Sequence, residues 1–135
     1  MPFTHPLTVH FADTDAAGVV YFARTLSLCH EAYEEALSAA GIALSRFFAD
    51  TGTVVPITHA EADYLRPLAC GDRLRITATP AALGPDTFEV RYVIERLGPP
   101  DKKAATARTV HVCIASADRR RLPLPPALAA WVAAG

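Results

Sequence analysis

Apolar residues recur at helical spacing in one long stretch of the chain, residues 23–40. They lie three or four positions apart, which places them on one face of an α-helix. Gly41 follows directly, and glycine is the residue that most often ends a helix. The pattern therefore predicts one long helix, whose apolar face is formed by Leu26, Cys29, Tyr33, Ala36, Leu37 and Ala40.

Five other stretches are predicted as β-strands: residues 7–11, 54–64, 73–79, 87–96 and 105–115. In several of them apolar side chains alternate with charged or polar ones, which is typical of a sheet with one buried face. The links between the last three strands contain glycine and proline and resemble hairpin turns, so we expect an antiparallel arrangement. A short second helix is predicted at residues 44–49, ending near Gly52.

The order of one strand, one long helix and four strands predicts an α+β fold. One helix covers only one face of such a sheet, so we expect at least a homodimer to cover the other. The tail, residues 122–135, is rich in proline and alanine and contains Trp131. It forms either a short helix packed on the body or a frayed end.

Composition narrows the class of protein. The chain has 135 residues, which fits a single domain over 1–135, and its hydrophobic content of 51% argues against disorder. A net charge of −1 gives no general attraction to nucleic acid or to an anionic membrane. The sequence has neither a secretory signal nor an apolar run near the ~18 residues of a membrane span, so we expect a cytoplasmic protein.

Metal and common nucleophile motifs are absent from the sequence. It contains no GxSxG elbow, P-loop, GxGxxG or HExxH. The three cysteines have no CxxC spacing, which argues against a disulfide framework or a zinc knuckle, and the five histidines show no ligand spacing. We therefore expect no metal and no cofactor.

The segment that stands out is residues 10–22, HFADTDAAGVVYF, which holds two carboxylates, Asp13 and Asp15, ahead of the long helix. One interpretation is helix capping, because Asp and Thr are good N-cap residues. The other is chemistry: a carboxylate beside a helix N-terminus can attack a carbonyl carbon while the free N–H groups stabilise the oxyanion. Gly18 would allow close approach of the backbone to a ligand, or a positive φ. The residues alone leave both interpretations open.

A resemblance favours the chemical interpretation. The segment is similar to the pattern D-x-D-x-x-G-[VI]-V-[YW]-[FH] of the 4-hydroxybenzoyl-CoA thioesterase family, which has the hotdog fold, a long central helix wrapped by a curved antiparallel sheet. Within that family, the stretches ADTDAAGVVYFA, CHEAYE, CGDRL and HVCIA resemble the 1,4-dihydroxy-2-naphthoyl-CoA thioesterases (hydrolases) of phylloquinone biosynthesis. The resemblance extends over most of the chain and implies a metal-independent acyl-CoA thioesterase.

The resemblance also implies roles for individual residues. The family's catalytic acid matches Asp15, and its backbone oxyanion donor falls near Phe22, with Tyr21 beside it; Asp13 is a cap or turn residue. The family forms homodimers and often homotetramers, as a dimer of dimers, in which the acyl pocket lies between subunits. Its lining, opposite the acid, matches Val54, Val55, Pro56 and His59. Candidates for the coenzyme A phosphates are Arg66, Arg91, Lys102, Lys103 and the run Arg119-Arg120-Arg121.

Three alternatives remain at this point. The same chemistry could act on 4-hydroxybenzoyl-CoA or on a short or medium acyl-CoA. A non-catalytic acyl-CoA binding protein could share the fold, although a binder needs no carboxylate at the scissile carbonyl. A hotdog dehydratase would ordinarily use a catalytic histidine, which this motif lacks.

Overall fold

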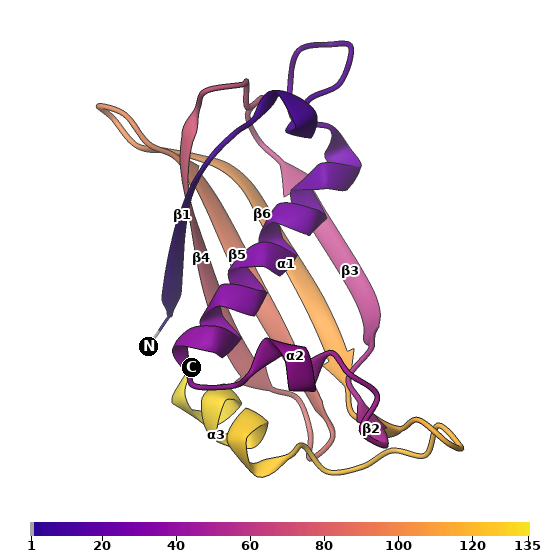
Figure 1. Cartoon of the computed structure of the whole chain (residues 1–135). Coiled ribbons are helices and arrows are strands. Elements are labelled where there is room, and N and C mark those ends of the chain that lie inside the picture. The colour runs from indigo at the N-terminus through magenta and orange to yellow at the C-terminus, as the bar shows by residue number, and fades with distance from the viewer. Residues whose placement is uncertain (1) are drawn as a thin grey trace.

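Five antiparallel strands form a sheet that curves around one long helix (Figure 1). The computed structural model describes residues 2–135. The strands lie side by side in the order β1-β4-β5-β6-β3, so β1 and β3 are the two edges. Their bounds are β1 Phe3–Thr8, β3 Ile57–Tyr64, β4 Arg73–Ala82, β5 Thr87–Arg96 and β6 Lys102–Val112. The α+β architecture predicted from the sequence is confirmed.

The long helix α1 runs from Phe22 to Ala39, within one residue of its predicted bounds. Gly41 follows it with φ +85°, a left-handed conformation that ends the helix. Ala40, predicted on the buried face, is exposed instead, because it is already the C-cap residue of the helix. The buried stripe is wider than predicted and consists of Thr25, Leu28, Cys29, Ala32, Tyr33, Ala36 and Leu37.

The core lies between α1 and the concave face of the sheet. Alternate residues of β4 and β5 point into it, as the two-residue pattern predicted. Leu74, Ile76 and Ala78 come from β4, and Phe88, Val90, Tyr92 and Ile94 come from β5. The opposite face of the sheet carries the charged and polar residues of the same strands.

Four of the five predicted strands were wrong in their bounds. The first was expected at residues 7–11, but β1 is Phe3–Thr8, and Phe11 begins a 3₁₀ turn, Phe11–Asp13. Residues 54–64 split into β2, Thr53–Val54, and β3, because Pro56 has no N–H for a sheet ladder. Residues 105–115 split into β6, which begins at Lys102, and β7, Ile114–Ala115, which pairs with β2. The strand predicted at residues 73–79 continues to Ala82 in β4, because its pairing with β5 extends to Phe88.

The remaining helices close the end of the sheet away from the start of α1 (Figure 1). Helix α2, Leu44–Phe47, is shorter than predicted. The tail forms α3, Pro126–Ala134, so the packed-helix alternative is confirmed. Leu128 and Val132 are buried, and the Trp131 ring centroid lies 5.9 Å from that of Tyr33. None of the helices within residues 2–135 is long and apolar enough to cross a membrane.

Candidate active site

The Asp15 loop is a small hairpin that connects the 3₁₀ turn to α1. Thr14 and Val20 form an isolated antiparallel bridge, and the Asp15 N–H donates to the Val19 carbonyl at 3.0 Å. The turn closes with a 3.0 Å bond from the Gly18 N–H to the Asp15 carbonyl. Gly18 has φ +81°, which residues with a Cβ rarely adopt, so the predicted conformational role of this glycine is observed.

The Asp15 carboxylate is exposed at the tip of this hairpin. Its Oδ1 accepts a 2.8 Å hydrogen bond from the Ala17 N–H, which fixes the side chain over the turn. Within residues 2–135, Oδ2 has no hydrogen-bond partner, so one carboxylate oxygen is available to react.

The N-terminus of α1 has no side-chain cap. Tyr21 is the N-cap residue, and its own N–H donates to the Asp13 carbonyl at 3.0 Å. The first turn contains no acidic residue, and the N–H groups of Phe22 and Ala23 have no hydrogen-bond partner among the described residues. These two groups, with the positive end of the helix dipole, form a natural site for a developing negative charge.

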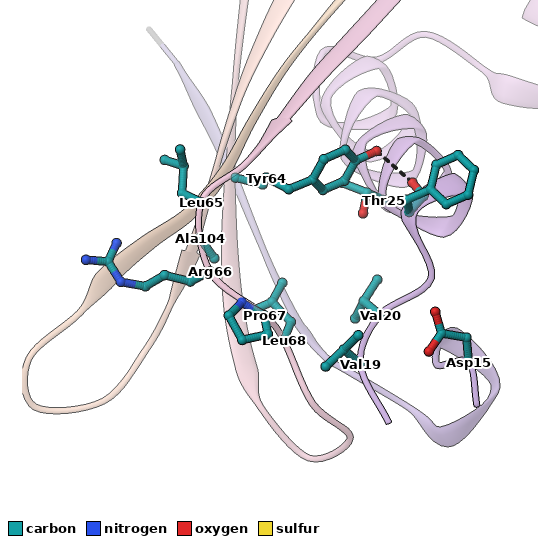
Figure 2. Close-up of a pocket in the computed structure, with 12 residues that line it drawn as sticks. Asp15, Val19, Val20, Thr25, Tyr64, Leu65, Arg66, Pro67, Leu68 and Ala104 are labelled. Carbon is teal, nitrogen blue, oxygen red and sulfur yellow. Dashed lines mark hydrogen bonds between the residues drawn. The ribbon is translucent and has the colours of Figure 1, made fainter. Parts of the chain in front are cut away.

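Asp15 and the start of α1 share one cleft of about 360 Å³ (Figure 2). Val19, Val20 and Phe22 line it from the Asp15 side, and Tyr64 comes from the end of β3. The other lining residues are mostly apolar and belong to the segment after β3, to β6 and to α1: Leu65, Arg66, Pro67, Leu68, Ala104, Ala105 and Thr25. A 2.8 Å bond from the Val20 N–H to the Leu68 carbonyl ties the two sides together. Of the cleft residues at 64–68, only Arg66 was singled out in the sequence. Sequence reasoning missed Tyr64, Leu65, Pro67 and Leu68, since only the pairing of β3 with β6 brings them here.

Asp13 is a structural residue, as the cap interpretation predicted. It is 4% exposed, its Oδ2 accepts the His10 N–H at 2.8 Å, and its Oδ1 accepts Arg24 Nε at 2.7 Å. Burial raises the pKa of the Asp13 carboxyl, but the His10 hydrogen bond and Arg24 together hold it below its ordinary value. Asp13 therefore stays ionised and fastens the loop to α1.

The predicted acyl-pocket residues lie elsewhere in the same chain. Val54, Val55 and Pro56 line a separate cleft with Phe47 and Phe48, at the end of the molecule opposite the Asp15 loop (Figure 1). The exposed His59 contacts Glu61, with Nε2 3.2 Å from Oε1. One chain therefore does not bring these residues to Asp15. The sequence expectation concerned the partner subunit, and it stays a prediction.

The basic candidates for coenzyme A differ in their surroundings. Arg66 lines the cleft that contains Asp15, and its Nη1 donates to the Lys103 carbonyl at 2.6 Å. Arg91 is instead paired with Glu89 at 2.5 Å on the outer face of the sheet, and Arg121 lies 3.3 Å from Asp86. Among the described residues, no group of three or more His, Cys, Asp or Glu side chains could hold a metal ion.

Comparison with known proteins identifies the family. The family model of the thioesterase-like superfamily matches residues 9–132. The chain belongs to this superfamily.

Relatives of this thioesterase-like protein include a 1,4-dihydroxy-2-naphthoyl-CoA hydrolase from Synechococcus elongatus, 54% identical over 92% of this chain and 90% of the relative. A hydrolase of the same name from Thermosynechococcus vestitus is 50% identical over 93% of this chain and 84% of the relative. A crystal structure of a 1,4-dihydroxy-2-naphthoyl-CoA thioesterase from Synechocystis superposes with a TM-score of 0.93 at 37% identity, covering 98% of this chain and 96% of that one. The resemblance noted from the sequence and the hotdog fold are confirmed.

Proposed function

We propose that this thioesterase hydrolyses 1,4-dihydroxy-2-naphthoyl-CoA to 1,4-dihydroxy-2-naphthoate and coenzyme A, a step of phylloquinone biosynthesis. One hotdog domain over residues 1–135 performs the reaction without a metal or cofactor. The observation that carries the proposal is the shared cleft of Asp15 and the uncapped start of α1. Identity of 54% to a hydrolase of that name supports the naphthoyl ester as substrate.

Asp15 is the catalytic acid of the proposed reaction, in one of two ways. As a nucleophile, its carboxylate adds to the thioester carbonyl, the C–S bond breaks, and coenzyme A leaves as a thiolate that takes up a proton. Water then hydrolyses the mixed anhydride and regenerates Asp15. As a general base, Asp15 removes a proton from a water molecule that attacks the same carbon. Its free Oδ2 suits both routes.

The oxyanion forms at the start of α1 in either route. The N–H groups of Phe22 and Ala23 donate to the former carbonyl oxygen, and each such donor is commonly worth about 3 kcal/mol in the transition state. Tyr21 and Gly18 shape this site through the backbone, since one is the N-cap and the other turns the loop. Arg66, whose guanidinium makes one hydrogen bond among residues 2–135, has further N–H groups to offer and is a candidate for a coenzyme A phosphate.

A homodimer through β3 would complete the acyl pocket. Strand β3 is a sheet edge, and all of its residues except Ala62 are exposed. Two copies pairing antiparallel about a two-fold axis bring the Ile57 end of one strand beside the Tyr64 end of the other. The partner's Val54, Val55, Pro56 and His59 would then approach the cleft of Asp15. Light scattering should give a mass of two chains, or of four if two dimers associate.

The test of the function is thiol release from a panel of coenzyme A esters: dihydroxynaphthoyl, 4-hydroxybenzoyl, short acyl and long acyl. Asp15→Asn should lose about 10²–10⁴-fold in rate while its melting temperature stays the same. The matched control is Asp118→Asn, because Asp118 also accepts an N–H two residues on, from Arg120 at 3.0 Å, in an exposed turn. This variant should keep full activity.

Each outcome of the panel is decisive. Preference for the naphthoyl ester that is lost in Asp15→Asn supports the function and its catalytic residue together. Preference for another ester would support thioesterase activity but refute 1,4-dihydroxy-2-naphthoyl-CoA as the substrate. Binding of esters without thiol release would make the protein a non-catalytic acyl-CoA binder and would refute the proposal.

A further inference from the structure

Tyr64 connects the edge strand β3 to the start of α1. Its hydroxyl donates a 2.9 Å hydrogen bond to the carbonyl oxygen of Phe22, the first residue of the helix (Figure 2). The two residues are 42 positions apart in sequence, and both line the cleft that contains Asp15. The bond therefore links two separate walls of the candidate active site.

The acceptor of this bond is part of the oxyanion site. The Phe22 carbonyl and the Ala23 N–H belong to the same peptide group. A donor on the carbonyl oxygen polarises that group, so its N–H becomes a stronger donor in turn. The Tyr64 hydroxyl thus acts on one of the two unpartnered N–H groups at the helix start.

The same bond also holds that N–H group in place. Helix α1 has no side-chain cap, and its first turn depends on backbone bonds such as Arg24 N–H to Tyr21 carbonyl, 2.8 Å. Tyr64 adds a side-chain contact from outside the loop. Small errors in the position of such donors are costly, because misplacement by about 1 Å can lower a rate by about 10²-fold.

Folding makes little use of this hydroxyl. In the single chain Tyr64 is 52% exposed, so water can replace the bond while the chain folds. A helical carbonyl at this position can also accept the N–H of Leu26, four residues on, and needs no second partner. A purely structural role would therefore leave the rate of catalysis unchanged when the hydroxyl is removed.

We infer that Tyr64 is a positioning residue for thioester hydrolysis, which orients and polarises the oxyanion donor at Ala23 through the Phe22 carbonyl. The inference rests on the proposed function. It assigns to β3, the edge of the sheet, a direct influence on the reacting end of α1.

The test is Tyr64→Phe, which keeps the ring and removes only the hydroxyl. With the best ester of the panel, kcat should fall about tenfold, less than the about 10²–10³-fold for deletion of a whole oxyanion donor. KM should change less than about twofold, because the effect belongs to the transition state. The matched control is Tyr33→Phe, since the buried Tyr33 hydroxyl has no partner in residues 2–135 and lies outside the cleft. It should keep the wild-type kcat.

Hydrogen exchange of the peptide that covers residues 20–28 gives a readout without substrate. Tyr64→Phe should exchange faster there than wild type, whereas exchange in β5 should not change. An unchanged kcat overturns the inference, as does a rise in KM alone, which would make Tyr64 a substrate contact. A lower kcat with unchanged hydrogen exchange would mean that the Tyr64 hydroxyl contacts the substrate directly, and this result also overturns the inference. If wild type releases no thiol from any ester, the proposed function fails first and this inference fails with it.

Discussion

His111 should make the folded protein sensitive to mild acid. Its side chain is fully buried, with the ring stacked on Phe88 at 4.6 Å. Nε2 lies 2.7 Å from the Thr109 hydroxyl, while Nδ1 has no partner within the described part of the chain. Burial, and secondly the charge of His30, lower the pKa of His111 from 6.5 to about 4.

The size of the effect follows from linkage. The unfolded chain binds a proton at His111 near pH 6.5, but the folded chain does so only near pH 4. Between these values the unfolded state binds more protons, so stability is complete above pH 6.5 and falls as the pH falls. At 1.36 kcal/mol per pH unit, the loss over the whole window is about 3 kcal/mol. This loss is a large part of the free energy of unfolding of a typical domain, which is about 5–15 kcal/mol.

Urea unfolding between pH 7.5 and 4.5, followed by the fluorescence of Trp131 at a fixed protein concentration, measures this loss. His111→Phe should be less stable than wild type at pH 7.5, because it changes a packed position, but its stability should fall less toward pH 4.5. His10→Gln, at an exposed position, is the control for the loss of one histidine. Parallel curves for wild type and His111→Phe would refute the argument, since the carboxylates that titrate are common to both proteins.

Three further changes test the loop and the tail. Gly18→Ala should cost about 1–2 kcal/mol, because a Cβ meets no atom within 4 Å but φ is +81°; an unchanged melting temperature would contradict this. Asp13→Asn should lower the free energy of unfolding at pH 7 by about 1–3 kcal/mol, because the Arg24 bond weakens. Because the Asp13 pKa is lowered in the folded protein, the stability difference between wild type and Asp13→Asn should shrink as the pH falls through this pKa. A difference in urea unfolding that stays constant with pH would be inconsistent with the Asp13–Arg24 pair. Leu128→Ala should cost about 2–5 kcal/mol in thermal unfolding, as the side chain is 2% exposed, and a cost under about 1 kcal/mol would mean that α3 is dispensable.

Local patterns predicted the elements that local interactions determine. The period of α1 and the glycine that ends it lie within one segment, and the alternation in β5 predicted its bounds without error. The first strand was misplaced because Thr4, His5 and Pro6 look polar or strand-breaking, while the edge position of β1 tolerates all three. That position depends on pairing with β4, which lies far along the chain.

The residues of the candidate site also fall into two groups, those contained in a local motif and those brought together by strand pairing. Asp15 and Gly18 belong to one loop and Phe22 begins the helix that follows, so a single motif contained all three, and capping geometry explained Asp13. Tyr64 gave no signal in the sequence, because an aromatic residue at the end of a strand is ordinary. Only the register of β3 on β6, with Tyr64 opposite Ala105, brings its hydroxyl to α1.

The two edge strands of the sheet differ in their ability to pair with a strand of another chain. Prolines occur on edge strands where the missing N–H faces solvent, so Pro6 removes a donor from the outer rim of β1. Strand β3 contains no proline along Ile57–Tyr64. If only one edge of the sheet can pair with another chain, assembly through the sheet ends at a dimer. If both edges can pair, chains can add without limit. Pro6 therefore disfavours the pairing of a further strand with β1, and its replacement by a residue with an N–H would add one hydrogen-bond donor to that edge.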